Sequence, residues 1–237
     1  MRYLKTDKMY CFSPPVMIAT FFIEIACAIY VAFRYKMTDI TRLAVVLLSC
    51  LALFQFAEFN VCEGTFDIGS LVWARIGCVA ITLLPPLGLH MTTRIAGKKY
   101  LLLVMLGYLS SLIFLYTFIT AGGGIESQQC LGNYVIFNIA KWANVPYLFY
   151  YYGWLLVTVG LAWKWGKSMK ARSKRISLYT LAVGYLAFIV PTTAANIINP
   201  TTVAGIPSIM CGFAVILALM LTGFVLPRYY MNEEKEK

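Results

Sequence analysis

The sequence predicts an all-α polytopic membrane protein, a bundle of seven transmembrane helices with its N-terminus outside and its C-terminus in the cytoplasm. Three observations predict this class. First, 60% of the 237 residues are hydrophobic and only 13% are charged, which is too little charge for a soluble domain of this size. Second, seven apolar runs of about twenty residues are each long enough to cross a bilayer as a helix. Third, short basic loops alternate along the chain with neutral or acidic ones.

The whole chain, 1–237, is expected to form one seven-helix domain. Helices are the expected structure because lipid offers backbone groups no partner and the runs are too long for barrel strands. Prolines at 85–86, 146, 191 and 207 are expected to bend or break the third, fifth, sixth and seventh helices. The spans cover approximately residues 14–33, 43–61, 71–93, 100–120, 145–165, 176–198 and 206–226.

Charged or turn-forming residues delimit the runs in order. Arg34 and Lys36 end the first run, and Arg94 follows the third. The stretch Ala121-Gly122-Gly123-Gly124, expected to be flexible, follows the fourth run, and a longer polar loop leads to the fifth. The basic loop 164–175 separates the fifth from the sixth, and a short polar tail follows the seventh.

Lysine and arginine determine the expected orientation. Loops 34–42 and 94–99 carry three basic residues each and loop 164–175 carries six, with one acid among them, whereas the loop after the second span is acidic. Cytoplasmic loops collect positive charge, so the three basic loops are expected in the cytoplasm. Three basic residues before the first span depart from this pattern.

The cysteines and the net charge limit the chemistry. Cys62 and Cys130 are both expected on the outer side, where they either form a disulfide or remain two unpaired thiols, with Cys11 as a competing partner. The chain has one histidine and no CxxC pair, so no metal site and no cofactor are expected. The net charge of +10 lies mostly in loops between apolar runs, which argues against nucleic-acid binding.

Two carboxylates and one arginine within the predicted spans bear on a possible site. Glu24 falls near the middle of the first helix, and groups at that depth normally face a bundle interior or a wet cavity. Glu58 and Arg75 lie at similar depth on helices joined by a short loop, so they could pair. Such a pair either fixes the register of the two helices or forms the polar wall of a site that opens to the outside.

Aromatic residues collect at the same level. Tyr147, Tyr151 and Trp154 follow one another at i, i+4 and i+7 on the fifth helix, and Trp73 lies in the third. Asn196 follows Pro191 on the sixth. Individually, such aromatics are typical interfacial anchors. Together, a few polar groups among aromatics are typical of a small-ligand pocket.

Several activities find no support in the residues. His90, the only histidine, has no serine, aspartate or second histidine placed for nucleophilic catalysis, so the protein is not expected to be an enzyme. The last span lacks the lysine that a retinal protein needs. No convincing internal repeat links helices one to three with helices five to seven, which disfavours a repeat-built transporter.

Two segments carry a family resemblance. The third span, with Trp73-Ala74-Arg75-Ile76, Leu84-Pro85-Pro86-Leu87 and Gly97-Lys98-Lys99, resembles the third helix of the seven-helix sensor region found at the N-terminus of many prokaryotic histidine kinases. The stretch from Pro191 to Phe213 resembles that family's sixth and seventh helices. The resemblance implies a membrane sensor in a prokaryotic cytoplasmic (inner) membrane. Only nine residues follow Arg228, so a stand-alone sensor that signals through a partner, or a reused scaffold, is expected.

The leading functional hypothesis is a receptor-like protein with an outward-facing pocket for a small molecule. Glu58 and Arg75 are expected to hold the ligand's polar end, the four aromatics its body, and Asn196 a hydrogen bond, with Glu24 nearby. Signalling would use a cytoplasmic or membrane partner, or a second copy of the chain, and membrane lipid would surround the bundle. The alternatives are an accessory subunit of a larger membrane complex and a small transporter or channel.

Overall fold

The computed structural model describes residues 13–64, 67–120, 124–130 and 135–233, and confirms seven helices long and apolar enough to cross a membrane. Cys11 and the glycines at 122 and 123 lie outside the described residues. The helices are α1 (Pro14–Arg34), α2 (Asp39–Glu63), α3 (Ser70–Thr82) with α4 (Leu84–Ile95), α5 (Leu101–Ile119), α6 (Lys141–Ser168), α7 (Arg172–Ile198), and α8 (Ile206–Met220) with α9 (Leu226–Glu233).

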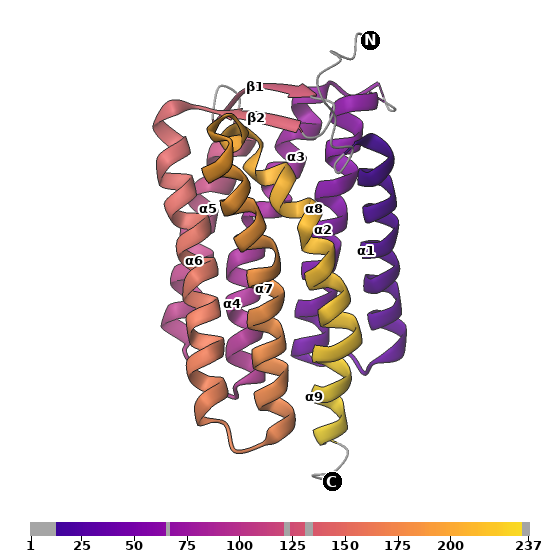
Figure 1. Ribbon diagram of the computed structural model, residues 1–237, viewed down its shortest axis with the longest axis vertical. Helices are drawn as coiled ribbons and strands as arrows, with labels where there is room; N and C mark the ends of the chain where they lie inside the picture. The colour runs from indigo at the N-terminus through magenta and orange to yellow at the C-terminus, as the bar shows by residue number, and fades with distance from the viewer. Residues whose placement is uncertain (1–12, 65–66, 121–123, 131–134, 234–237) are drawn as a thin grey trace.

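The helices run along the long axis of the molecule and two short strands cover one end (Figure 1). We call this the hairpin end and the opposite end, where α9 terminates, the α9 end. Within the bundle, α2 contacts α1, α3, α4 and α8, while α7 contacts α6, α8 and α9. The three basic loops of the sequence connect helices at the α9 end.

The third span is interrupted at Leu83, where α3 ends and α4 begins. The cause is the Pro85–Pro86 pair. Proline has no backbone N–H, so Pro85 and Pro86 cannot donate to the carbonyls of Ile81 and Thr82, four residues earlier. Proline does fit the first turn of a helix, so a new helix begins here. The predicted break in this helix is therefore present: one helix ends and a second begins within the same span.

The other predicted prolines act differently. Pro207 lies in the first turn of α8, which follows the 3₁₀ segment η2 (Pro200–Gly205). Pro146 and Pro191 lie inside α6 and α7, and neither helix is broken there. The last span instead changes geometry at η3 (Leu221–Val225), one π-helical turn between α8 and α9, which has no proline in it.

The loop before the fifth span contains a β-hairpin that the sequence reasoning did not predict. Strands β1 (Ile125–Cys130) and β2 (Val135–Ile139) pair antiparallel, with Cys130 opposite Val135. Cys130 is bonded to Cys62 at the end of α2, the disulfide among the alternatives that the sequence leaves open. The bridge attaches the hairpin to the top of the bundle, over the ends of α2 and α3.

Candidate functional site

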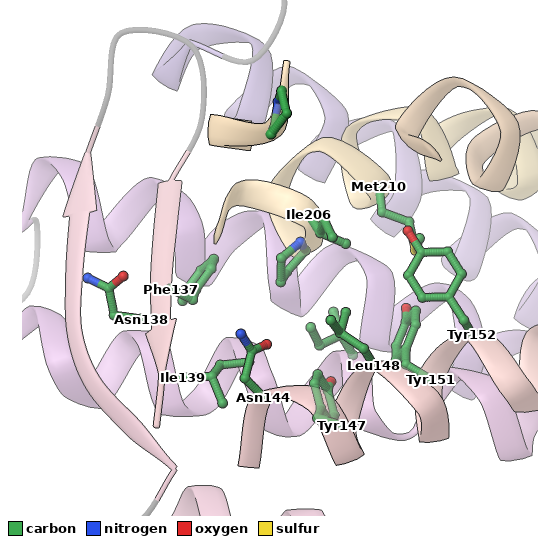
Figure 2. A pocket seen from close by; sticks show the side chains of 13 residues that line it. Phe137, Asn138, Ile139, Asn144, Tyr147, Leu148, Tyr151, Tyr152, Ile206 and Met210 are labelled. Atoms are coloured by element: carbon green, nitrogen blue, oxygen red, sulfur yellow. The ribbon is translucent and has the colours of Figure 1, made fainter. Parts of the chain in front are cut away.

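A cavity of about 280 Å³ lies at the hairpin end, between the hairpin, α6 and the start of α8. Figure 2 shows side chains from these elements turned toward one another around it. Its walls are mostly aromatic and aliphatic, with two asparagines and three tyrosines as polar groups. The lining residues are Ile81, Phe137, Asn138, Ile139, Asn144, Tyr147, Leu148, Tyr151, Tyr152, Pro200, Ile206, Pro207 and Met210.

The α6 wall follows from helical spacing. Asn144, Tyr147, Leu148 and Tyr151 occupy positions i, i+3, i+4 and i+7, which share one helix face. Tyr147 and Tyr151 are only 3% and 6% exposed, so their rings are fixed by packing. Phe118 of α5 meets the ring of Tyr147 edge-on at 5.0 Å. This side of the cavity is therefore rigid and aromatic.

Two tyrosines connect this wall to the break in the third span. The Thr82 hydroxyl donates to the Cys78 carbonyl at 2.6 Å, so its oxygen accepts from the hydroxyl of Tyr147 at 3.0 Å. The Tyr150 hydroxyl donates to the carbonyl of Thr82 at 2.6 Å. That carbonyl is one that Pro86 leaves without a helical donor. The Thr82 carbonyl at the buried end of α3 thus has its hydrogen-bond donor on α6.

A second connection runs from the hairpin to the bundle interior. The backbone N–H of Val135 donates to the hydroxyl of Ser208 at 3.2 Å, and Ser208 also hydrogen-bonds to the Glu58 carboxyl group. One buried hydroxyl therefore joins β2, α8 and α2. Ser208 directly follows Pro207, which lines the cavity.

Two carboxyl groups lie together in the interior beside this junction. Glu24 and Glu58 are 0% and 1% exposed and close enough to interact electrostatically. Among the described residues, neither oxygen of Glu24 has a hydrogen-bond partner, nor does Oε1 of Glu58. Cys211 of α8 is within electrostatic range of both carboxyls and of Tyr147 and Tyr151 in the cavity wall. Buried ionisable groups in a membrane protein are rare and are the usual candidates for a functional site.

The structure brings only part of the predicted site together. Tyr147 and Tyr151 line the cavity, and Glu58 and Glu24 lie in the adjoining interior. Trp73 packs edge-on against Phe56 of α2 at 5.6 Å and does not line the cavity.

Two further predicted residues, Trp154 and Asn196, lie elsewhere in the bundle. Trp154 donates from Nε1 to Ser110 of α5 at 2.9 Å. Asn196 accepts from the hydroxyl of Thr202 at 2.6 Å, which holds η2 against the end of α7. Both residues stabilise helix contacts and neither lines the cavity.

Glu58 and Arg75, which by their depth could pair, do not form an ion pair. In the part of the chain that the structure describes, Nε of Arg75 has no hydrogen-bond partner either. The reason is the face that α3 presents to α2. Gly77 makes the close approach, where an added Cβ would lie 3.2 Å from Phe54, and Arg75 is half-buried on a different face. Glu58 instead turns toward α8.

Residues missed by sequence reasoning include Asn138, Asn144 and Ser208. Asn144 could have been found, because it lies three residues before Tyr147 on the same face of α6. The hairpin residues and Ser208 carry no such signal, because their places depend on how β2 and α8 fold over the bundle.

The described residues contain no group of three or more His, Cys, Asp or Glu side chains that could hold a metal ion. Comparison of the chain with protein-family models and with curated proteins finds no match. The resemblance to histidine-kinase sensor regions therefore stays a prediction from the sequence.

Proposed function

We propose that the protein is a receptor-like membrane protein that binds a small molecule in the cavity at the hairpin end and signals through a separate partner. One observation carries the proposal. The cavity is bounded by residues at two interruptions of the helices, Ile81 and Tyr147 beside the break at Leu83, and Ile206 and Pro207 at the start of α8. An occupant there contacts both interruptions, where a change of helix position needs the fewest broken helical hydrogen bonds.

The lining indicates the chemical class of ligand. No charged side chain is among the cavity's described lining residues. A neutral and largely apolar molecule is favoured, with one or two groups that hydrogen-bond to Asn144 or a tyrosine hydroxyl. The volume of about 280 Å³ is near the lower limit for ligand pockets, so the molecule is small.

We further propose that the hairpin end faces outward in a prokaryotic cytoplasmic membrane. The basic loops lie at the α9 end, and positive loops favour the cytoplasm. The Cys62–Cys130 bridge lies at the hairpin end, and disulfides persist in oxidising compartments. Both observations support the same orientation.

Signal transfer needs two states that the ligand binds with different affinity. Ligand contacts on Ile206 and Met210 would favour one position of α8, and η3 and α9 continue that helix to the α9 end. A partner at the cytoplasmic surface, or a second copy of the chain, would then detect the position of α9.

Native mass spectrometry of protein gently extracted from its own membrane tests the proposal. We expect a discrete small mass at one per chain. Leu148→Trp, which fills the cavity, should remove that mass, whereas Leu156→Trp should retain it because Leu156 is 54% exposed on the lipid side of the same helix. Retention in both variants contradicts the cavity assignment. Stoichiometric additional protein chains without a small mass would support an accessory subunit instead.

A small transporter or channel is a second candidate, and the buried pair Glu24 and Glu58 favours it. Ionisable groups inside membranes commonly mark ion or substrate pathways. In proteoliposomes, flux that Glu24→Gln abolishes would support transport. An impermeable bilayer in the presence of the bound small molecule would support the receptor.

A further inference from the structure

A second cavity, of about 310 Å³, lies at the α9 end around the turn from α4 to α5. It shares no residue with the ligand cavity. Its lining combines three cationic side chains with an apolar rim. The lining residues are His90, Thr93, Arg94, Lys98, Lys99, Tyr100, Leu101 and Val104.

The turn that forms this cavity has a defined geometry. Gly97 ends α4 with φ of 63°, a left-handed conformation that favours glycine. The N–H of Lys98 donates to the carbonyl of Thr93 at 3.0 Å, and that of Gly97 to Arg94 at 3.0 Å. Tyr100 then stacks on Trp165 of α6 at 5.2 Å. The two lysines are thus held next to Arg94 by the backbone.

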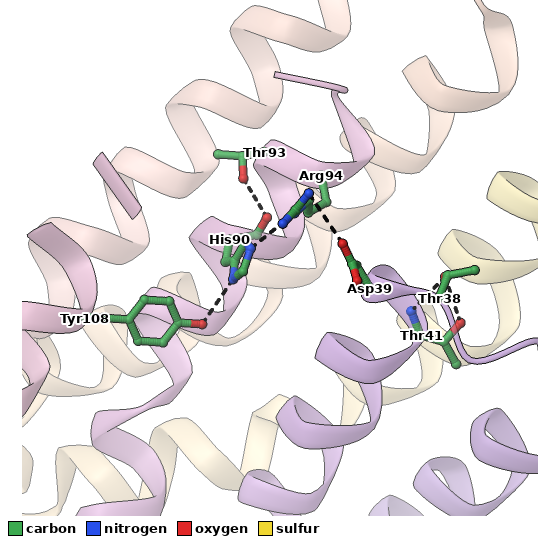
Figure 3. Close-up of polar contacts among 7 residues, drawn as sticks. All are labelled: Thr38, Asp39, Thr41, His90, Thr93, Arg94 and Tyr108. Carbon is green, nitrogen blue, oxygen red and sulfur yellow. Dashed lines mark hydrogen bonds and ion pairs between the residues drawn. The ribbon is translucent and has the colours of Figure 1, made fainter. Parts of the chain in front are cut away.

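A polar network holds Arg94 at the cavity (Figure 3). Its Nε donates to Nε2 of His90 at 3.2 Å, so His90 carries its proton on Nδ1, 3.3 Å from the hydroxyl of Tyr108. Its Nη1 lies 3.4 Å from Asp39 at the start of α2. The side chains of Arg94 and Asp39 are 51% and 60% exposed, so water screens their attraction and Asp39 neutralises Arg94 only weakly.

The net positive charge of the cavity lining favours binding of an anion. The described lining has three cations and no acid, and the nearest carboxylate is the one already shared with Arg94. A phosphate group bound by lysine and arginine is the usual complement of such a cluster.

The apolar rim indicates that the anion carries a lipid tail. Leu101 at the rim is 70% exposed, and the outward face of α5 continues from it as an exposed aliphatic stripe. That stripe consists of Leu102, Met105, Leu106, Leu109, Leu112 and Ile113. In a bilayer this face contacts acyl chains, so a headgroup in the cavity and tails on α5 fit one molecule.

We propose that this cavity binds the headgroup of an anionic phospholipid, with its phosphate among Arg94, Lys98 and Lys99 and its acyl chains along α5. Binding is selective for this turn, and does not follow from positive charge at the α9 end in general. The proposal is independent of the ligand cavity at the hairpin end.

The test uses the full chain, stripped of lipid in detergent and titrated with phosphatidylglycerol or phosphatidylcholine under native mass spectrometry. The cavity variant replaces Arg94, Lys98 and Lys99 with Gln. Each lysine or arginine near an anionic headgroup strengthens binding, so we expect the affinity of this variant for phosphatidylglycerol to fall at least about tenfold. Phosphatidylcholine should bind weakly and equally to both proteins.

A matched control removes the same charge from the same end. Lys167, Lys170 and Arg172, all exposed around the α6–α7 turn, are replaced with Gln. We expect phosphatidylglycerol affinity to stay within about twofold of the unmodified protein. Equal losses in the two variants overturn the proposal, as does equal binding of the two lipids. Protection of the buried cysteines Cys27, Cys50, Cys78 and Cys211 from a maleimide dye reports that each variant is folded.

Inorganic phosphate separates a lipid from a free anion. It should fail to displace phosphatidylglycerol at millimolar concentration, because it lacks the acyl chains that bind α5. Full displacement would identify a soluble phosphate as the occupant and overturn the lipid assignment.

Discussion

The contact between α4 and α7 allows a quantitative prediction at Gly88. An alanine Cβ built there would overlap the hydroxyl oxygen of Tyr185 and come within 2.7 Å of Cζ, whereas ordinary contact begins at 3.4 Å. Tyr185 is 1% exposed and cannot turn away. Gly88→Ala therefore forces α4 and α7 apart, and we expect it to destabilise the protein by about 1–3 kcal/mol.

A matched control and a second-site change separate overlap from helix propensity. Gly160→Ala on α6 meets nothing within 4 Å and should be neutral or stabilise slightly, because alanine favours helices. Tyr185→Phe should be nearly neutral alone, since its hydroxyl has no hydrogen-bond partner among the described residues. Combined with Gly88→Ala it should recover roughly half of the lost stability, a coupling of about 1 kcal/mol.

The buried thiols offer the assay. Cys27, Cys50, Cys78 and Cys211 are free and buried, so a maleimide dye labels them only as the protein unfolds on heating. A background with Cys11→Ser removes the cysteine that lies outside the described residues. We expect the midpoint temperature of labelling to be roughly 2–12 °C lower for Gly88→Ala than for the unmodified protein. An unchanged midpoint, or a fall that Tyr185→Phe does not lessen, would refute the close approach of α4 and α7.

Two further predictions concern the ends of the bundle. Cys62→Ser opens a covalent loop spanning 68 residues, and we expect it to cost at most about 4 kcal/mol, measured by the same labelling with Cys130→Ser to remove the new thiol. An unchanged midpoint would show that the helices alone hold the hairpin in place. Burial raises the pKa of Tyr35, which stacks on Tyr230 of α9 at 5.0 Å. The folded state thus favours the neutral phenol of Tyr35. The stability that this preference contributes is fully present below about pH 10 and is lost as the pH rises through the pKa of Tyr35 in the folded protein. Tyr35→Phe should flatten the alkaline fall in stability, and an unaltered fall would exclude this residue as its source.

Most of the fold could be predicted from the sequence because each span is a long apolar run between charges. Even the interruption of the third span has a local cause, since two adjacent prolines remove two N–H donors. The π-helical turn at Leu221–Val225 has no such marker. The hairpin was missed because its strands do not alternate polar and apolar residues: Ile125–Cys130 is mostly polar and Val135–Ile139 mostly apolar.

The candidate site was less predictable, because helix spacing reveals a face but not the neighbour that covers it. Tyr147 and Tyr151 were found by spacing alone. Arg75 was assigned to Glu58 from depth alone, although two residues at equal depth meet only if their faces agree. The actual partner of Glu58, Ser208, lies 150 residues away on α8, a proximity that only the packing of the bundle creates.

The disulfide also bears on how the chain enters the membrane. Cys62 and Cys130 are separated by one descending span, α3 with α4, and one ascending span, α5. If either span failed to insert, the two thiols would end on opposite sides of the bilayer and could not meet. The bridge therefore excludes molecules in which only one of the two spans crossed, and a gel run without reductant can separate those molecules from oxidised ones.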